Sequence, residues 1–335
     1  MRERAHISVA IPLHNEESTL PELLRRLGGV LDAIPGGPHE IVLVDDGSRD
    51  RTLELLEAAS RRDHRLVVVA LSRNFGHQAA LSAALDFVSG DVVVAMDGDL
   101  QDRPEAIPEL LAKYYEGYDV VYVQRAKRKE GLLLRASYFI FYRLLASLSD
   151  TRLPVDSGDF ALMARRVVEQ MRAAPERHRY LRGLRSWVGF KQTGLVVERD
   201  ERFAGKTNYG PIKLLKLASD GLFSFSTVPL RAAALIGLFA IGMSALFSGY
   251  TLYARLFLHR APAGFTALML FMSFLSGVQL LFLGIVGEYI GRIYQEAKHR
   301  PIYVVGNVIR HTARISGEVA RLSESALDPY RRRIG

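Results

Sequence analysis

The stretch VVVAMDGD, from Val92 to Asp99, ends an apolar run with two carboxylates one residue apart. Side chains two positions apart in a strand point to the same side, so Asp97 and Asp99 can present paired oxygens at the strand end. Hard divalent cations prefer such oxygen ligands and fill their other positions with water and substrate phosphates. A tight turn is an equally good interpretation, because Asp and Gly are common turn residues. The stretch by itself leaves both interpretations open.

Apolar runs alternate with helical patterns over residues 1 to about 125 and predict an α/β fold. Continuous apolar strands of this kind are typical of a parallel sheet that is covered by helices on both faces. Ligands of such sheets bind beyond the carboxyl ends of the strands. The predicted strands are Ile7–Ile11, Ile41–Val44, Leu66–Leu71, Asp91–Met96 and one near Val120–Val123, and the predicted helices are Ser18–Leu31, Arg51–Arg61 and His77–Ser89.

Polar residues follow four successive predicted strands. The segments are PLHNEE from Pro12, DDGS from Asp45, SRNFGH from Ser72 and DGDLQD from Asp97. Each segment alone could be a loop or a helix cap, but four in succession favour a binding site at one edge of the sheet. The sequence lacks a Gly-x-Gly-x-x-Gly loop after its first strand and lacks a P-loop, which argues against a dinucleotide oxidoreductase and a P-loop NTPase.

The composition narrows the class of partner. The formal net charge of +8 suggests a polyanionic partner, either a phosphorylated ligand or an anionic lipid. Nucleic acid ranks lowest, because aromatic residues do not interleave with basic ones in any continuous run. The chain has no cysteine, which excludes disulfides and thiolate metal sites. The N-terminal residues do not have the pattern of a signal peptide, so we expect the N-terminal part to stay in the cytoplasm.

Two long runs, residues 232–254 and 261–287, carry no charged side chain. Each run meets the roughly 20 residues that a helix needs to cross a bilayer, whereas a buried helix of a soluble protein is the alternative. Basic residues flank the outer ends of the two runs, which predicts that both ends face the cytoplasm. Glycines on both runs could allow close helix packing and association into a homo-oligomer. We therefore expect a multi-pass protein of the cell (inner) membrane.

Several motifs, taken in order, resemble those of a known family. IPLHNE from Ile11, VDDGS from Val44 and DGDLQD from Asp97 resemble inverting family 2 glycosyltransferases of the GT-A fold. SRNFGHQ from Ser72, GDF from Gly158 and SFSTVPLR from Ser224 are similar to the polyprenyl-phosphate glycosyltransferases. That group includes bactoprenol glucosyltransferases and is related to dolichol-phosphate mannose synthases. The resemblance spans nearly the whole chain.

The resemblance implies a cytoplasmic catalytic domain followed by membrane elements. The domain would have a Rossmann-like, mostly parallel sheet. The implied boundaries are a GT-A domain over 1–205, an interfacial amphipathic segment over 206–228, a transmembrane hairpin with helices at 229–257 and 263–291, and a cytoplasmic tail over 292–335.

The resemblance also implies a donor site and a metal. Pro12, Glu16 and Asp46 would contact the nucleobase and ribose of a sugar nucleotide. The implied nucleotide-sugar set is Pro12, Asn15, Glu16, Asp45, Asp46, Asp97 and Gln101. Mg²⁺ or Mn²⁺ would lie among Asp97, Asp99 and Gln101 and bridge the donor diphosphate, where a cation stabilises the departing charge.

An acceptor site follows from the same resemblance. Arg125, Arg135, Arg202 and Lys206 would bind the phosphate of a polyprenyl lipid. Asp159 stands where these enzymes carry an acid beside the acceptor, and with Asp99 it is a catalytic candidate. A phosphate acceptor is already ionised, so positioning could replace general-base catalysis, and Asp156 could hold the role instead. The chain departs from the family pattern at Thr207 and Asn208, where Ser-Lys is usual, and at Ala161, where Arg is common.

The implied reaction moves a sugar, glucose from UDP-glucose first, to undecaprenyl or another polyprenyl phosphate for modification of cell-envelope glycans. Mannose, an N-acetylhexosamine or an aminoarabinose-type sugar are the alternative cargoes. A non-catalytic scaffold or flippase subunit is the rival from another class. A processive polysaccharide synthase fits less well, because Arg185-Ser186-Trp187 lacks the Gln of the Gln-x-x-Arg-Trp segment.

Overall fold

The computed structural model describes residues 4–125, 157–177, 179–197, 228–257, 264–310 and 313–315. The chain divides into two compact units. The described residues up to 197 and from 301 onward form an α/β unit, and those from 228 to 300 form a helical unit. The predicted interfacial segment over 206–228 lies outside the described residues, apart from its last residue.

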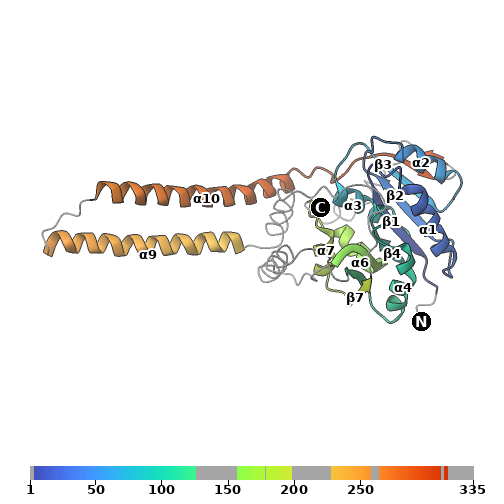
Figure 1. Ribbon diagram of the computed structural model, residues 1–335, viewed down its shortest axis with the longest axis horizontal. Coiled ribbons are helices and arrows are strands. Elements are labelled where there is room, and N and C mark those ends of the chain that lie inside the picture. The colour runs from blue at the N-terminus through green and yellow to red at the C-terminus, as the bar shows by residue number, and fades with distance from the viewer. Residues whose placement is uncertain are drawn as a thin grey trace, which may run out of the picture. The chain divides into compact units, whose positions relative to one another are not determined.

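The α/β unit is built on a single sheet in the order β7-β5-β6-β4-β1-β2-β3-β8-β9 (Figure 1). Its four central strands, β4, β1, β2 and β3, run parallel to one another. The α/β prediction is therefore confirmed. The strands are β1 Ile7–Leu13, β2 Glu40–Asp45, β3 Leu66–Leu71, β4 Val92–Ala95, β5 Val120–Arg125, β6 Ser157–Ala164, β7 Gln192–Val197, β8 Val305–Arg310 and β9 Ala313–Ile315.

Helices pack on the sheet through their buried faces, and α1 shows the pattern most clearly. In α1, the buried residues Leu20, Leu23, Leu27 and Leu31 recur every three or four positions, which places them on one face. Helix α3 packs on β1 and β2, α2 on β3, α4 on β5 and β6, and α6 and α7 on β6. The bounds are α1 Leu20–Asp32, α2 Thr52–Ser60, α3 His77–Phe87, η1 Pro104–Ala106, α4 Ile107–Tyr115, α6 Arg165–Ala173 and α7 Leu181–Trp187.

Strand β6 brings a distant segment to the end of β4. It runs antiparallel to β4, with Ala95 opposite Ala161. Continued by two residues, this register places Asp159 opposite Asp97. The antiparallel direction is what allows a residue at the start of β6 to face a residue that follows β4.

Strands β8 and β9 come from a region for which the sequence predicts a tail. Strand β8 pairs antiparallel with β3, and β9 pairs with β8. Val308 is buried and lies opposite Val69. The sequence alone does not reveal these strands, because β8 is short, only half apolar and far from β3 along the chain.

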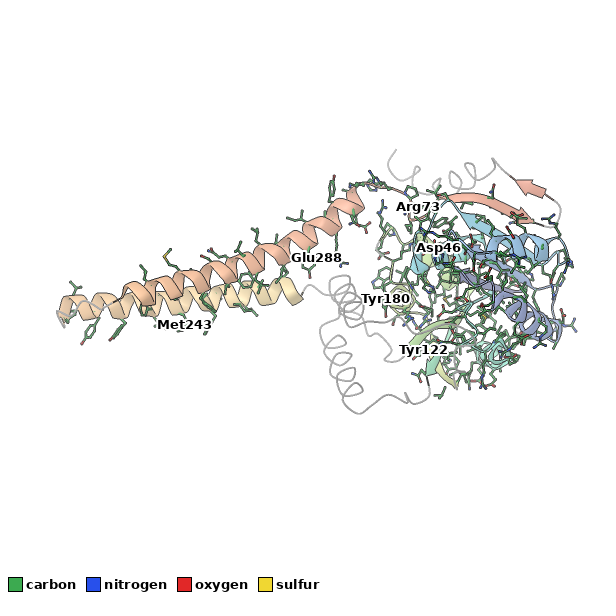
Figure 2. All side chains as sticks on the ribbon, turned by 45° about the horizontal axis from the view of Figure 1, so that its top comes forward. Asp46, Arg73, Tyr122, Tyr180, Met243 and Glu288 are labelled. Atoms are coloured by element: carbon green, nitrogen blue, oxygen red, sulfur yellow. The ribbon has the colours of Figure 1, made fainter. Side chains whose placement is uncertain are left out.

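The helical unit consists of α9, Val228–Phe257, and α10, Phe265–Ala297. The rings of Phe247 and Phe271 stack with their centroids 6.2 Å apart, so the two helices contact each other. Apolar side chains project from both helices (Figure 2). By length and composition, one described segment, Phe274–Ala297, could cross a membrane, and Leu235–Phe247 is a shorter apolar stretch. The predicted two-helix transmembrane hairpin thus stays a prediction.

Among the described residues of these two helices, the glycines make no close contact with the other helix. A Cβ atom added at any of the six glycines that the sequence suggests for close contact would have no atom of another segment within 4 Å. Bulky side chains such as the two phenylalanines make the contact instead. The six positions are Gly237, Gly242, Gly249, Gly277, Gly284 and Gly287.

Candidate active site

The loops that follow β2 and β3 lie against each other at the carboxyl edge of the sheet. Gly47 has φ +64°, and a Cβ atom there would lie 2.6 Å from the backbone carbon of Arg73 and the backbone nitrogen of Asn74. Only glycine allows so close an approach with a positive φ. Figure 2 marks Asp46 and Arg73, one from each of these two loops.

Asp46 ties the same two loops together. Its buried carboxylate accepts hydrogen bonds from the backbone N–H groups of Phe75, at 2.7 Å, and Gly76, at 2.9 Å. Burial raises the pKa of Asp46, although the two N–H donors oppose this effect. Sequence reasoning suggests that Asp46 contacts a nucleotide. The structure gives both of its oxygens a backbone partner and makes it the anchor of the loop that leads into α3.

Asp45, the last residue of β2, has an unsatisfied oxygen. Its Oδ2 accepts the N–H of Ser48 at 3.3 Å. Its Oδ1 is buried and lacks a hydrogen-bond partner in the described part of the chain. A buried acceptor without a partner is costly, so this oxygen is suited to receive a donor group from a ligand.

The other predicted nucleotide residues surround the end of β1. Pro12 is buried inside β1 beside Val44. Asn15 is exposed with φ +57°, and its Oδ1 accepts the N–H of Arg49 at 2.8 Å. The Oε2 of Glu16 accepts the hydroxyl of Thr19 at 2.7 Å, which stabilises the approach to α1. Of these three residues, Asn15 is the most accessible to a ligand.

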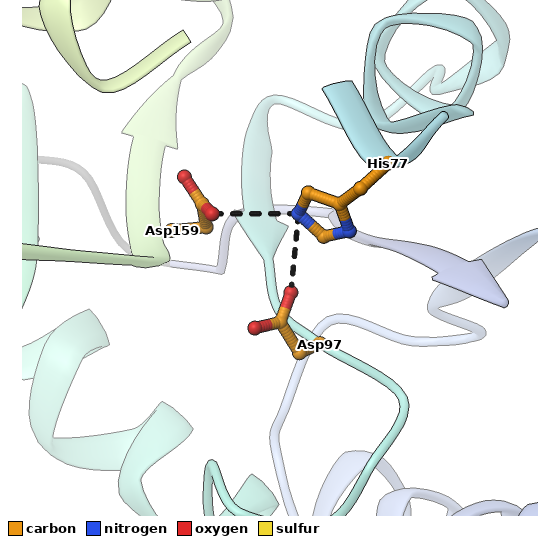
Figure 3. Close-up of side chains that lie close together, drawn as sticks. All are labelled: His77, Asp97 and Asp159. Carbon is orange, nitrogen blue, oxygen red and sulfur yellow. Dashed lines mark hydrogen bonds and ion pairs between the residues drawn. The ribbon is translucent and has the colours of Figure 1, made fainter. Parts of the chain in front are cut away.

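His77, Asp97 and Asp159 converge beyond β4 (Figure 3). The Nε2 atom of His77 lies 3.5 Å from Oδ1 of Asp97 and 3.4 Å from Oδ2 of Asp159. His77 is the first residue of α3, and Asp159 is in β6. The sequence motif that includes His77 is recognisable, but it assigns no role to this side chain. Sequence reasoning therefore missed His77 as a member of the site.

Arg182, in α7, forms a bidentate ion pair with Asp159. Its Nε and Nη2 atoms lie 2.7 Å from the two carboxylate oxygens of Asp159, whose side chain is only 3% exposed. Burial raises the pKa of Asp159, but the hydrogen bonds and charge of Arg182, together with His77, outweigh burial and hold this pKa well below its usual range. A carboxylate with so low a pKa is a weak proton acceptor at neutral pH.

A second guanidinium, that of the buried Arg185, lies one turn further along α7. Both terminal nitrogens of Arg185 lie 3.3 Å from the carbonyl oxygen of Gly158, the residue before Asp159. Burial lowers the pKa of Arg185 to about 10, so it remains a cation at neutral pH. Sequence reasoning considered Arg185 only as part of a synthase motif, and Arg182 not at all.

Burial and the charges of this cluster also shift the pKa values of His77 and Asp97. Burial lowers the pKa of His77, but the hydrogen bond to Asp159 and the charges of Asp97 and Asp159 raise it more, and the net shift is upward. Burial raises the pKa of Asp97, and the nearby charges of Asp159 and Asp99 add to that effect against the attraction of His77. A further cation would relieve the repulsion between these carboxylates.

The cluster has the donor set of a divalent metal site. One ligand atom from each of His77, Asp97 and Asp159 lies within 4.8 Å of the others. The Oδ1 atom of Asp97 is buried and has no hydrogen-bond partner among the described residues. Carboxylate oxygens suit Mg²⁺ and Mn²⁺, and an imidazole nitrogen adds a ligand that transition metals accept. The residues present therefore fit a divalent cation.

The predicted metal set overlaps this cluster at Asp97. Asp99 follows in the turn, and its Oδ1 accepts the backbone N–H of Gln101 at 3.1 Å. The turn interpretation of Asp-Gly-Asp thus also holds, since Gly98 and Asp99 form a turn after β4. Asp99 and Gln101 stay predicted ligands.

Of the four basic residues predicted to bind the acceptor phosphate, Arg125 lies within the described part of the chain. Arg125 is the last residue of β5, and its backbone is described while its side chain is not. The other predicted residues, Arg135, Asp156, Arg202 and Lys206, lie outside the described residues.

Comparison with known proteins places the chain in a family. Residues 8–172 match the family model described as glycosyl transferase family 2. The bactoprenol glucosyl transferase of Shigella phage SfV is 39% identical over 90% of this chain and 98% of its own length. The chain belongs to glycosyl transferase family 2. This glycosyltransferase is also 44% identical to the uncharacterized glycosyltransferase YkcC of Bacillus subtilis (strain 168), over 91% of this chain and 94% of that protein.

A third relative is similar over the same length. The prophage bactoprenol glucosyl transferase homolog of Escherichia coli (strain K12) is 37% identical over 90% of this chain and 99% of its own length. The α/β unit of the glycosyltransferase is thus a GT-A-like fold. The matched region 8–172 contains His77, Asp97 and Asp159, whereas Arg182 and Arg185 follow it.

Proposed function

We propose that this glycosyltransferase moves a sugar from a nucleotide diphosphate sugar to the phosphate of a polyprenyl lipid, with inversion at the anomeric carbon. The observation that carries the proposal is the meeting of His77, Asp97 and Asp159 at the carboxyl edge of the sheet, in a geometry that can hold a cation. Relatives named bactoprenol glucosyl transferases support glucose as the sugar and a bactoprenol-type lipid as the acceptor.

The order of the strands suggests how the donor lies. Asp45 ends β2, Asn15 follows β1 and Asp97 follows β4, and these strands are neighbours in the sheet. A nucleoside bound near Asp45 and Asn15 would direct its diphosphate toward Asp97. UDP-sugars are the favoured donors.

The chemistry is a single displacement. An oxygen of the lipid phosphate attacks the anomeric carbon, a new carbon–oxygen bond forms, and the bond to the nucleoside diphosphate breaks on the opposite face. Mg²⁺ or Mn²⁺ held by Asp97, with His77 and Asp159 or with Asp99 and Gln101, would neutralise the charge that develops on the departing diphosphate. The chain itself supplies the carboxylates that would bind the cation and the loops that would orient the donor.

The membrane is the natural location for this reaction. The segment Phe274–Ala297 is long and apolar enough to anchor the chain where a polyprenyl phosphate resides. A multi-pass arrangement in the inner membrane, with the catalytic unit in the cytoplasm and Arg125, Arg135, Arg202 and Lys206 near the lipid phosphate, completes the proposal. Cell-envelope glycan modification is the purpose that fits such a product.

Transfer of radiolabelled sugar tests the proposal. The full chain in membranes would be given UDP-glucose and undecaprenyl phosphate, with Mg²⁺, with Mn²⁺ or with a chelator, and the lipid fraction would be counted. We expect label in the lipid with a metal present and loss of label with the chelator. Other nucleotide sugars in parallel identify the cargo. Absence of transfer from every donor would favour the scaffold or flippase alternative.

A matched pair of variants separates the site from the fold. Asp97→Asn removes a charge from the cluster and should reduce transfer by at least about a hundredfold, as expected for a lost electrostatic contact to the transition state. Asp91→Asn makes the same change just before β4, where Oδ2 accepts the N–H of His6, and should leave transfer close to the wild-type rate. Equal losses in both variants would point to misfolding.

A further inference from the structure

We propose that Arg182 binds the phosphate of the acceptor lipid and that Asp159 is the positioning residue that orients Arg182. This inference rests on the proposed function, because it names the group that receives the acceptor in that reaction. It assigns to Asp159 a role other than general base, and it assigns a substrate contact to a residue of α7.

The geometry of the pair supports this division of roles. Asp159 uses both oxygens on the Nε and Nη2 atoms of Arg182, so the planar guanidinium is held in a single orientation. The Arg182 side chain is 28% exposed, whereas that of Asp159 is 3% exposed. Part of the Arg182 side chain is therefore open to an incoming anion, whereas the Asp159 side chain is almost fully covered. Guanidinium groups bind phosphate through paired, charge-assisted hydrogen bonds.

The local charge supports an anion as the ligand. Arg182 and Arg185 both lie in the field of the same carboxylate, Asp159, and His77 contacts that carboxylate as well. Arg185 is buried against the carbonyl oxygen of Gly158, which carries no full charge to neutralise it. The side of the site around β6 and α7 is thus rich in positive charge, which attracts a phosphate.

The position of the pair in the sheet favours the acceptor over the donor. Strand β6 lies on one side of β4, and β1 and β2 lie on the other. The nucleotide-binding candidates follow β1 and β2, so a donor extending to Asp97 approaches from that side. Asp159 and Arg182 then lie across Asp97 from the nucleotide, where the attacking group must stand for an inverting displacement.

The chemistry of the acceptor removes the need for a base at Asp159. A phosphate monoester has its second pKa at about 6 and is largely a dianion at neutral pH. Its oxygen can attack without giving up a proton. A carboxylate that is held by a guanidinium is suited to fix geometry, and the guanidinium lowers the cost of bringing a dianion beside Asp97 and Asp159.

Acceptor and donor KM values in charge variants of Arg182 test the proposal. Arg182→Gln should raise KM for undecaprenyl phosphate by about tenfold or more, the size expected for a lost charge-assisted hydrogen bond, and should change KM for the nucleotide sugar by less than about twofold. Arg182→Lys keeps the positive charge but loses the planar guanidinium with its paired N–H donors, and it should give an intermediate KM for undecaprenyl phosphate. A raised donor KM with an unchanged acceptor KM would overturn the proposal.

The control is an ion pair between α6 and the residue that precedes β5. The Nε and Nη2 atoms of Arg166 lie 3.1 and 2.5 Å from Oδ1 of Asp119, which is 4% exposed and precedes β5. Arg166→Gln should leave both KM values unchanged. If Arg182→Gln fails to fold, the double variant Arg182→Gln with Asp159→Asn removes both charges and should still show the weak acceptor binding. Wild-type acceptor affinity in that folded variant would overturn the proposal.

The pH profile distinguishes a positioning residue from a base. The acid limb of kcat/KM for the acceptor should follow the ionisation of the lipid phosphate and persist in Asp159→Asn at a lower rate. Loss of that limb in Asp159→Asn would identify Asp159 as the base and overturn the assignment. Binding of undecaprenyl phosphate to the full chain in vesicles, measured without a donor, tests this inference separately from the proposed function. Unequal affinities of wild type and Arg182→Gln support this inference even if sugar transfer, and with it the proposed function, fails.

Discussion

At the scale of single residues, the Nε2 atom of His77 stands between the carboxylates of Asp97 and Asp159. The two negative charges raise the pKa of His77 above its ordinary value of 6.5, against the lowering effect of burial. The protonated ring therefore stabilises the fold fully below pH 6.5. This contribution disappears as the pH rises through the higher pKa of the folded state.

The stability of the protein should accordingly depend on pH through His77. In metal-free buffer, the melting temperature of the wild type should fall more steeply above pH 6.5 than that of His77→Gln, which lacks the titrating group. His64→Gln changes an exposed histidine and should follow the wild-type curve. Parallel curves for the wild type and His77→Gln would contradict the raised pKa. Differential scanning fluorimetry of the full chain in detergent provides the measurement.

At the scale of elements, the loops after β2 and β3 act as one unit. Gly47 allows their close approach, and Asp46 binds the two N–H groups just before α3. These contacts determine where α3 begins, and hence where His77 lies. The site is thus set by loop contacts that the strands alone do not dictate.

Gly47→Ala should disturb this unit more than an ordinary glycine substitution would. The new methyl group would lie 2.6 Å from backbone atoms, and the backbone at position 47 has a positive φ that alanine adopts poorly. We therefore expect a loss of more than about 2 kcal/mol of stability. Gly117 has φ +98° and open space around its Cβ position, so Gly117→Ala should cost only about 1–2 kcal/mol. Thermal unfolding measures both, and stabilisation by UDP-glucose should be lost only in Gly47→Ala. A smaller loss at Gly47 than at Gly117 would refute the close contact.

Strand β8 is the second element that distant contacts decide. Val308→Asp would bury a charge opposite Val69 and should cost about 2 kcal/mol or more. Arg310→Asp makes the same substitution at an exposed position of β8 and should cost under about 0.5 kcal/mol. The comparison, made by thermal unfolding, shows whether the segment after α10 contributes to the stability of the α/β unit. Equal melting temperatures would mean that β8 contributes nothing to the stability of the sheet.

At the scale of the whole molecule, the chain combines a charged α/β unit with a helical unit whose side chains are largely apolar and exposed. Exposed leucines along Phe274–Ala297, including Leu280, Leu281 and Leu283, are unfavourable in water and favourable in lipid. The composition of this unit therefore explains why a membrane is the expected surroundings of the chain.

Leu281→Arg should weaken membrane attachment. An arginine near the middle of a spanning helix costs about 2.5–3.5 kcal/mol on insertion scales, so more of the variant should be extracted from membranes at alkaline pH. Val196→Arg alters an exposed apolar residue of β7 and should be retained like the wild type. Equal extraction of Leu281→Arg and the wild type would show that this segment does not carry the attachment.

The sequence by itself determined the central strands, the helices between them and the family. The central strands are continuous apolar runs and helix α1 has an apolar stripe, and these are local patterns. The carboxyl ends of β1 to β4 had to meet at one edge once the strands were parallel, which is why Asp45 and Asp97 were recognisable as candidate site residues.

Only the tertiary structure decided which distant groups meet Asp97. Asp159 reaches it through the antiparallel register of β6, and His77 reaches it through the loop contacts of Asp46. Arg182 in turn reaches Asp159 through the packing of α7 on β6. The same holds for β8, whose partner β3 is more than 200 residues away along the chain. The order and register of strands depend on contacts between remote segments, and local hydrophobic patterns carry no information about them.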